Sequence, residues 1–109
     1  MDQSEAVAAL GALAQDSRLA IFRLLVQAGP PGLPAGQIGE RLGLAPATLS
    51  FHLKTLRAAG LVEQRRDGRS LIYAVDYARM QGLLGYLTEH CCEGDPQLCG
   101  LPAQAGCGS

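Results

Sequence analysis

Apolar residues recur at steps of three and four through the first sixty residues, the spacing that places side chains on one face of an α-helix. The pattern predicts a helix over residues 4–14, capped by Ser4, and a second helix that begins at Asp16 or Ser17. The Gly-Pro-Pro-Gly run at 29–32 ends this second helix, because neither residue type continues a helix well.

Two more helices are expected on either side of a very short link. The third covers residues 35–42 and stops at Gly43, while the fourth begins at Pro46, a residue favoured at the first helical position, and ends at Gly60. The fourth helix has one apolar stripe, formed by Leu49, Leu53 and Leu56. Its other faces carry polar residues: Thr48, Ser50, His52, Lys54 and Arg57. This arrangement is typical of a helix-turn-helix.

The next segment predicts a β-hairpin. Two β-prone runs, 61–66 and 69–75, flank Asp67-Gly68, and this dipeptide is a strong hairpin signal because a type I′ turn needs positive φ at both central residues. Three arginines surround the turn: Arg65, Arg66 and Arg69. A basic hairpin beside a helix-turn-helix would contact DNA phosphates or the minor groove.

The last helix is expected over residues 77–91. Its apolar residues follow an a/d-like seam: Tyr77, Met80, Leu84, Leu87 and Cys91. The seam either packs on the chain's own core or joins two subunits. The sequence beyond it is rich in Gly, Pro and Cys and predicts little regular structure. We therefore expect one domain over residues 1–92 and a tail over residues 93–109.

Composition and charge support this picture. The chain has 109 residues, 48% of them hydrophobic and 17% charged, which fits a single folded domain. No run of 18 apolar residues occurs, and the first five residues include two acidic residues and no basic one, so we expect a cytoplasmic protein without a membrane helix or a signal peptide. The net charge is −1, yet six of the nine basic residues lie between positions 41 and 75. This clustering favours a phosphate-binding surface over an ordinary distribution of surface charge.

The predicted fold is mainly α with a β-hairpin wing, in the order α-α-α-α-β-β-α, which is a winged helix-turn-helix. Residues 50–62 read S-F-H-L-K-T-L-R-A-A-G-L-V and are followed by R-R-D-G-R at 65–69 and by Tyr73. This combination, together with D-S-R-L-A-I-F at 16–22, resembles the ArsR/SmtB family of metal-responsive repressors. The resemblance covers residues 5–92.

The resemblance implies a homodimer, held by its first and last helices, that binds operator DNA and releases it when a ligand binds. It places DNA contacts at Thr48, Ser50 and His52 of the recognition helix, and in the wing at Arg65, Arg66, Asp67 and Arg69. Lys54 and Arg57 would neutralise phosphates. Phe51 stands where the family often has an arginine. The alternative for His52 is a histidine partly packed on its own helix.

All four cysteines lie in the last 19 residues: Cys91, Cys92, Cys99 and Cys107. Clustered thiols in a cytoplasmic protein indicate a metal, metalloid or redox site rather than a disulfide scaffold. The adjacent pair Cys91-Cys92 with Cys99 resembles a subset of arsenic-responsive members of the family. Soft thiolates suit soft ions, and three of them satisfy As(III) or Sb(III). The expected function is therefore a repressor that leaves its operator when As(III) or Sb(III) binds these three cysteines.

Other sensing sites of the family fit this sequence less well. Pro34 and Gly36 occupy the positions where one arsenic-sensing form has cysteines, and Ala78 follows Asp76 where a zinc-sensing form has a histidine. A zinc, cadmium or lead site that adds Cys107 or His90 remains an alternative, as does a thiol-redox sensor with a Cys92–Cys99 disulfide.

An enzyme is the competing class of function. A thiol-dependent reductase would need a reactive cysteine motif, but no Cys-x-x-Cys occurs in a βαβ context and no glycine-rich phosphate loop adjoins a cysteine. We therefore expect no catalytic activity. A winged helix that only binds proteins is the third possibility, and the basic wing argues against it.

Overall fold

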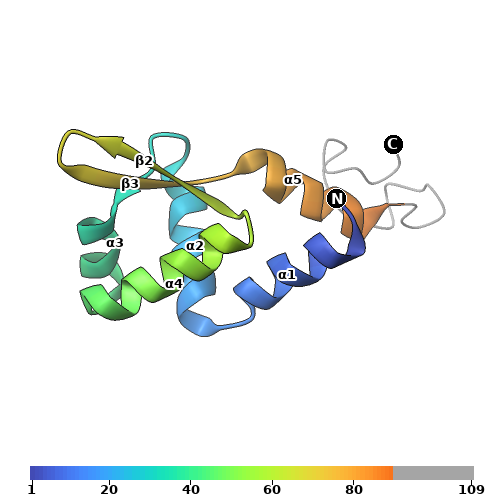
Figure 1. Cartoon of the computed structure of the whole chain (residues 1–109), viewed down its shortest axis with the longest axis horizontal. Helices are drawn as coiled ribbons and strands as arrows, with labels where there is room; N and C mark the ends of the chain where they lie inside the picture. Colours follow the sequence, from blue (N-terminus) through green and yellow to red (C-terminus); the bar gives the residue numbers. More distant parts are fainter. Residues whose placement is uncertain (90–109) are drawn as a thin grey trace.

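The computed structural model describes residues 1–89, which form five helices and a three-stranded antiparallel sheet (Figure 1). The elements are α1 (Gln3–Leu13), α2 (Asp16–Ala28), β1 (Leu33–Pro34), α3 (Ala35–Leu42), α4 (Pro46–Ala58), β2 (Val62–Asp67), β3 (Ser70–Val75) and α5 (Tyr77–Thr88). This arrangement confirms the expected winged helix-turn-helix. Among residues 1–89, none of the helices has the length and apolar character needed to cross a bilayer.

The first two helices begin at different caps from those expected. Asp2, not Ser4, caps α1: its carboxylate accepts from the Glu5 amide at 2.8 Å, and Glu5 Oε1 accepts from the Asp2 amide at 3.2 Å. This reciprocal capping box needs a glutamate three residues after the cap, and Asp2 has one. The cap of α2 is Gln15, whose side chain accepts from the Arg18 amide at 2.9 Å.

The helix-turn-helix agrees with the sequence prediction. Gly43 ends α3 in the left-handed conformation with φ of 66°, and Pro46 is the first residue of α4. Gly39 brings the two helices close together, because a Cβ there would lie 3.1 Å from the Leu44 carbonyl oxygen. The buried face of α4 contains Leu49, Leu53 and Leu56. The short link therefore holds α4 at a fixed angle against α3.

The sheet has the order β1-β3-β2, so the hairpin gains a third strand that the sequence does not predict. Leu33 pairs with Tyr73 across β1 and β3. In the hairpin, Asp67 pairs with Ser70, which makes Gly68 and Arg69 the two turn residues, one position later than expected. Gly68 has a positive φ of 63°, and a glycine suits the first central position of such a turn.

Gly32, the residue before β1, lies close to the backbone of Tyr73 in β3. Its φ is +70°, and a Cβ added to it would lie 2.4 Å from the Tyr73 carbonyl oxygen. Tyr73 belongs to β3, the central strand, which pairs with β1 on one side and β2 on the other. The chain can therefore enter β1 at this distance from β3 only because residue 32 has no side chain.

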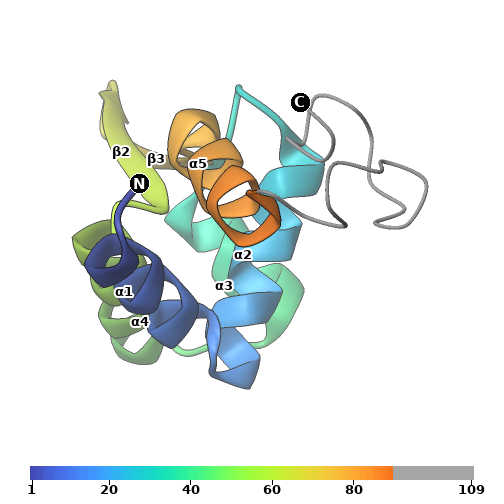
Figure 2. The ribbon, with the colours of Figure 1, turned by 90° about the vertical axis from the view of Figure 1, so that its right-hand side faces the viewer.

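The last helix and the first lie side by side at one end of the molecule, away from the hairpin tip (Figures 1 and 2). Leu83 is the buried residue of α5, whereas the predicted seam residues Leu84 and Leu87 are 39% and 53% exposed. Val7 and Leu10 of α1 are also exposed. We call these four residues the α1/α5 face. The predicted seam is thus divided: Tyr77 and Met80 pack against the subunit's own core, whereas Leu84 and Leu87 are exposed.

Arg79 of α5 connects this helix with α1 and with the turn that follows α4. Its guanidinium donates to Glu5 Oε2 at 2.5 Å, and its Nε lies where a Cβ on Gly60 would come within 2.8 Å. The hydrogen bond from the Asp2 amide, followed by the contact with Arg79, lowers the pKa of Glu5 below its ordinary value. One side chain of α5 therefore contacts both α1 and the turn after α4.

The helix α5 ends at Thr88, three residues earlier than expected. Glu89 leaves the helical conformation with ψ of 126°, and the Thr88 hydroxyl donates to the Leu84 carbonyl at 2.7 Å. The proposed ligands Cys91, Cys92, Cys99 and Cys107, the alternative ligand His90 and the boundary between residues 92 and 93 lie outside the described residues.

Candidate nucleic-acid interface

The outer face of α4 carries most of the side chains expected to meet DNA. Thr48, Ser50, Lys54 and Arg57 are all exposed, while the opposite face of the helix enters the core. Figure 1 shows the amino end of α4 at the same end of the molecule as the tip of the hairpin. The start of the recognition helix and the tip of the wing therefore both lie at the end of the molecule away from α5.

His52 is the exception among the expected contacts. It is only 8% exposed, and its Nδ1 lies 3.5 Å from Nη1 of Arg18. Position 52 follows Leu49 by three residues and precedes Leu56 by four, so it shares the buried side of α4. This placement favours the alternative of a histidine packed on its own helix over a DNA contact from His52.

Arg18 is the functional residue that the sequence did not single out. It lies on α2, donates from Nε to the Ala12 carbonyl at the end of α1 at 2.7 Å, and meets His52 with its other nitrogen. A single guanidinium thus connects three helices. The sequence signal was the arginine in the D-S-R-L motif, but its partners lie 6 and 34 residues away and no local pattern identifies them.

The three wing arginines are exposed but not equivalent. Arg65 donates to the carbonyls of Pro31 at 2.6 Å and Pro30 at 3.4 Å. Its guanidinium group therefore lies against the loop after α2. Arg66 and Arg69 lie nearer the tip and make no hydrogen bond or ion pair within residues 1–89. Their guanidinium groups are therefore the ones available to phosphate.

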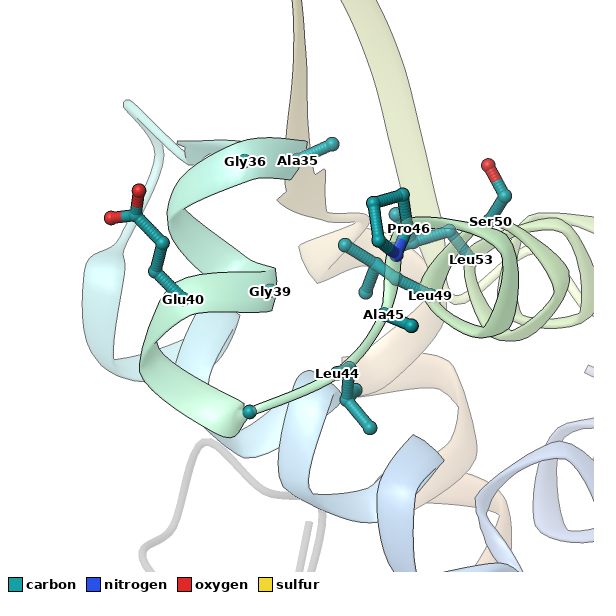
Figure 3. Close-up of a pocket in the computed structure, with 11 residues that line it drawn as sticks. Ala35, Gly36, Gly39, Glu40, Leu44, Ala45, Pro46, Leu49, Ser50 and Leu53 are labelled. Atoms are coloured by element: carbon teal, nitrogen blue, oxygen red, sulfur yellow. The ribbon is translucent and has the colours of Figure 1, made fainter.

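A groove of about 540 Å³ separates α3 from the start of α4 (Figure 3). Small residues form its α3 wall, including Ala35, Gly36 and Gly39, and Leu49 and Ser50 lie on the opposite side. Figure 3 shows the carboxylate of Glu40 directed away from α4. The residues that line the groove include no cysteine and no histidine.

Metal ligands are not brought together in this part of the chain. Among residues 1–89, no group of three His, Cys, Asp or Glu side chains is placed to hold a metal ion. Asp76, the possible zinc ligand, caps α5 by accepting from the Arg79 amide at 3.1 Å. The prediction of a sensor built from the C-terminal cysteines concerns residues outside this region.

Comparison with known proteins agrees with the geometry. A family described as a helix-turn-helix domain matches residues 13–65. The transcriptional regulator YgaV of Escherichia coli is 30% identical over 88 residues, which cover 81% of this chain and 87% of that protein. An ArsR-like regulator from Rhodococcus superposes with a TM-score of 0.72 at 27% identity, covering 89% of both chains. This chain belongs to the ArsR family.

Two further relatives of this ArsR-family chain bear on its assembly and extent. The regulator YceK of Bacillus subtilis is 46% identical over 59 residues, but the match spans only 54% of this chain and 58% of that protein. A winged helix-turn-helix DNA-binding domain from Mycobacterium bovis, described as homodimeric, superposes with a TM-score of 0.63 at 29% identity and covers 84% and 85% of the two chains. These relatives are transcriptional regulators, so the expectation that the chain is not an enzyme is confirmed.

Proposed function

We propose that this ArsR-family protein is a cytoplasmic homodimer that binds operator DNA, represses transcription and leaves the DNA when As(III) or Sb(III) binds its C-terminal cysteines. The observation that carries the DNA-binding part is the exposed polar face of α4, to which the wing adds Arg66 and Arg69, which have no hydrogen-bond partner within residues 1–89. The effector part is supported by the cysteine pattern of the sequence and by the donor chemistry of thiolates.

In the proposed complex α4 enters the major groove. Thr48 and Ser50 carry hydroxyls that can donate to or accept from base edges, and Lys54 and Arg57 lie further along the same helix. Arg66 and Arg69 neutralise phosphates beside the groove. The contacts of α4 would supply sequence preference, whereas the cations would supply most of the affinity.

The homodimer forms through the α1/α5 face. Four apolar side chains exposed on two adjacent helices are available for a partner, and the corresponding domain from Mycobacterium bovis is described as homodimeric. Two recognition helices about 34 Å apart read half-sites one turn of DNA apart. The helix α5 and the start of α1 lie at the end of the molecule away from the hairpin tip (Figure 1), so a dimer formed there would leave the wing free for DNA.

The salt dependence of DNA binding tests the proposed interface. We expect the affinity for duplex DNA to fall steeply with salt, because binding releases counterions from each neutralised phosphate. Arg66→Gln with Arg69→Gln should reduce the slope of log K against log salt by about 0.9 for each phosphate that is no longer neutralised. Fluorescence anisotropy with a labelled duplex at several KCl concentrations measures both slopes.

Arg23→Gln is the matched control, because Arg23 is exposed on α2 and lies outside the recognition helix and the wing. It should leave the slope unchanged. If the wild-type protein shows no salt-sensitive binding, or if the double variant keeps the full slope, the assignment of the wing is wrong.

The proposed effector site uses Cys91, Cys92 and Cys99. Adjacent cysteines converge on one ion only where the chain is not helical, and the end of α5 at Thr88 is compatible with this requirement. Three thiolates supply the soft, pyramidal donor set that As(III) and Sb(III) accept. Binding would tie the tail to the end of α5, close to Leu84 and Leu87, and so change the relative position of the two subunits.

Release of DNA by arsenite tests this site. A coupling of about 1–3 kcal/mol would weaken operator binding about 5- to 150-fold, and Cys91→Ser, Cys92→Ser or Cys99→Ser should reduce the change to near onefold. The measurement is anisotropy of an operator fragment with reduced protein, titrated with arsenite. Cys107→Ser is the control and should respond like the wild type.

The same titration separates the alternatives. Release by zinc, cadmium or lead alone would replace the three-thiolate site with one that adds Cys107 or His90. Release by peroxide alone would indicate a Cys92–Cys99 disulfide sensor. Full release of the Cys91→Ser variant by arsenite would contradict the proposed site.

A further inference from the structure

The recognition helix carries an aromatic ring that the proposed DNA contacts do not use. Phe51 is 63% exposed, more than any other large apolar side chain within residues 1–89. It lies four residues after Ala47 and three before Lys54, and both of these residues are exposed. Phe51 therefore occupies the outermost line of α4, opposite the buried leucines.

The surroundings of Phe51 are polar and basic. Within residues 1–89, the other exposed large apolar side chains lie at the amino terminus, on α1, α2 and α5, and at Leu71 of the wing, so α4 has no second one. Ser50 and Lys54 flank the ring on the helix surface. A single ring among hydroxyls and cations does not form an apolar patch of the size that marks a protein interface.

The ring is held in position from inside the fold. Phe51 contacts the imidazole of His52 edge to face, with the ring centroids 5.8 Å apart and the planes at 67°. His52 is buried and lies against Arg18, which is fixed to the Ala12 carbonyl. An exposed side chain with a buried neighbour of this kind loses less conformational entropy when it binds than a side chain that rotates freely.

From these observations we infer that Phe51 packs against the C5-methyl group of a thymine in each half-site of the operator. This inference rests on the proposed function, because it requires α4 to lie in the major groove. The thymine methyl is the apolar group of the major-groove edges, and phenylalanine is a side chain that recognises it by contact. Phe51 is thus a specificity-determining residue that distinguishes thymine from cytosine.

The experiment removes the methyl group and nothing else. Full-length reduced protein selects duplexes from a pool with a randomised centre, and each thymine of the selected sequence is then replaced by deoxyuridine. At one thymine in each half-site we expect about fourfold weaker binding, the ratio that corresponds to the roughly 0.8 kcal/mol gained by burying one methyl group. Substitution in both half-sites should weaken binding about 15-fold.

Phe51→Ala should bind the thymine and deoxyuridine duplexes equally, whereas Phe51→Leu, which keeps an apolar side chain, should retain part of the difference. Leu19→Ala is the matched control, because Leu19 is an exposed apolar residue of α2. It should keep the full wild-type ratio. Thermal unfolding of each variant shows whether the substitution leaves the fold intact.

Two results would overturn the inference while the proposed function stands: selective DNA binding that deoxyuridine leaves unchanged at every thymine, or a Phe51→Ala variant with the wild-type ratio. Absence of any sequence-selective, salt-sensitive DNA binding would instead refute the proposed function, and the role of Phe51 with it.

Discussion

The Gly32→Ala variant is expected to lose about 2–5 kcal/mol of its free energy of unfolding. The left-handed conformation of residue 32 costs a non-glycine residue about 1–2 kcal/mol, and overpacking adds about 1–3 kcal/mol. The new Cβ would lie 2.4 Å from the Tyr73 carbonyl oxygen and 3.1 Å from the Ala74 Cβ. Tyr73 cannot move away easily, because its strand is paired on both sides. Urea unfolding at a fixed protein concentration measures the loss.

Gly43→Ala separates the two contributions to this loss. Gly43 has φ of +66°, but a Cβ there meets nothing within 4 Å. The variant should therefore lose only the conformational part, about 1–2 kcal/mol. Equal losses at positions 32 and 43 would show that the close approach of residue 32 to β3 adds nothing to the free-energy cost of the alanine side chain.

A second large effect is expected on the α1/α5 face. Replacing Leu84 and Leu87 by glutamate places two charges where the proposed dimer buries apolar side chains, so we expect a monomer. Loss of bivalent binding should lower the affinity for a two-half-site duplex by about 100-fold or more. Sedimentation equilibrium gives the mass, and anisotropy gives the affinity.

Leu19→Glu is the control for this pair of substitutions. Leu19 is 44% exposed, comparable to Leu84, but it lies on α2. It should leave both the mass and the DNA affinity at wild-type values. A Leu84→Glu, Leu87→Glu protein that remains dimeric would refute the α1/α5 face as the subunit interface.

The sequence predicted those helix boundaries that neighbouring residues determine. Gly43 and Pro46 determine where α3 ends and α4 begins, and both boundaries agree with the structure. The strand β1 has only two residues and depends on pairing with Tyr73, forty residues later, so no periodicity could indicate it. The cap at Asp2 carries a local signal that the prediction missed, the glutamate three residues later, and the turn at Gly68-Arg69 lies one residue later than expected because Asp67 pairs with Ser70.

For the candidate interface, the sequence predicted which residues of α4 are exposed. Thr48, Ser50, Lys54 and Arg57 follow from the helical period once the leucine stripe is known. His52 lies on the side of that stripe, three residues after Leu49 and four before Leu56, but its contact with Arg18 of another helix has no local signal. The basic character of the wing follows from the sequence, but only the structure distinguishes Arg65, which hydrogen-bonds to backbone carbonyls, from Arg66 and Arg69.

The bridge from the Ala12 carbonyl through Arg18 to His52 affects how this protein can evolve. Any residue at position 12 supplies the same carbonyl, but a change at position 18 removes the partner of His52, and a change at position 52 removes one of the two partners of Arg18. We therefore expect substitutions at these two positions to be inherited together. A change at position 51 would leave the bridge between Ala12, Arg18 and His52 in place but would change the operators that the protein selects.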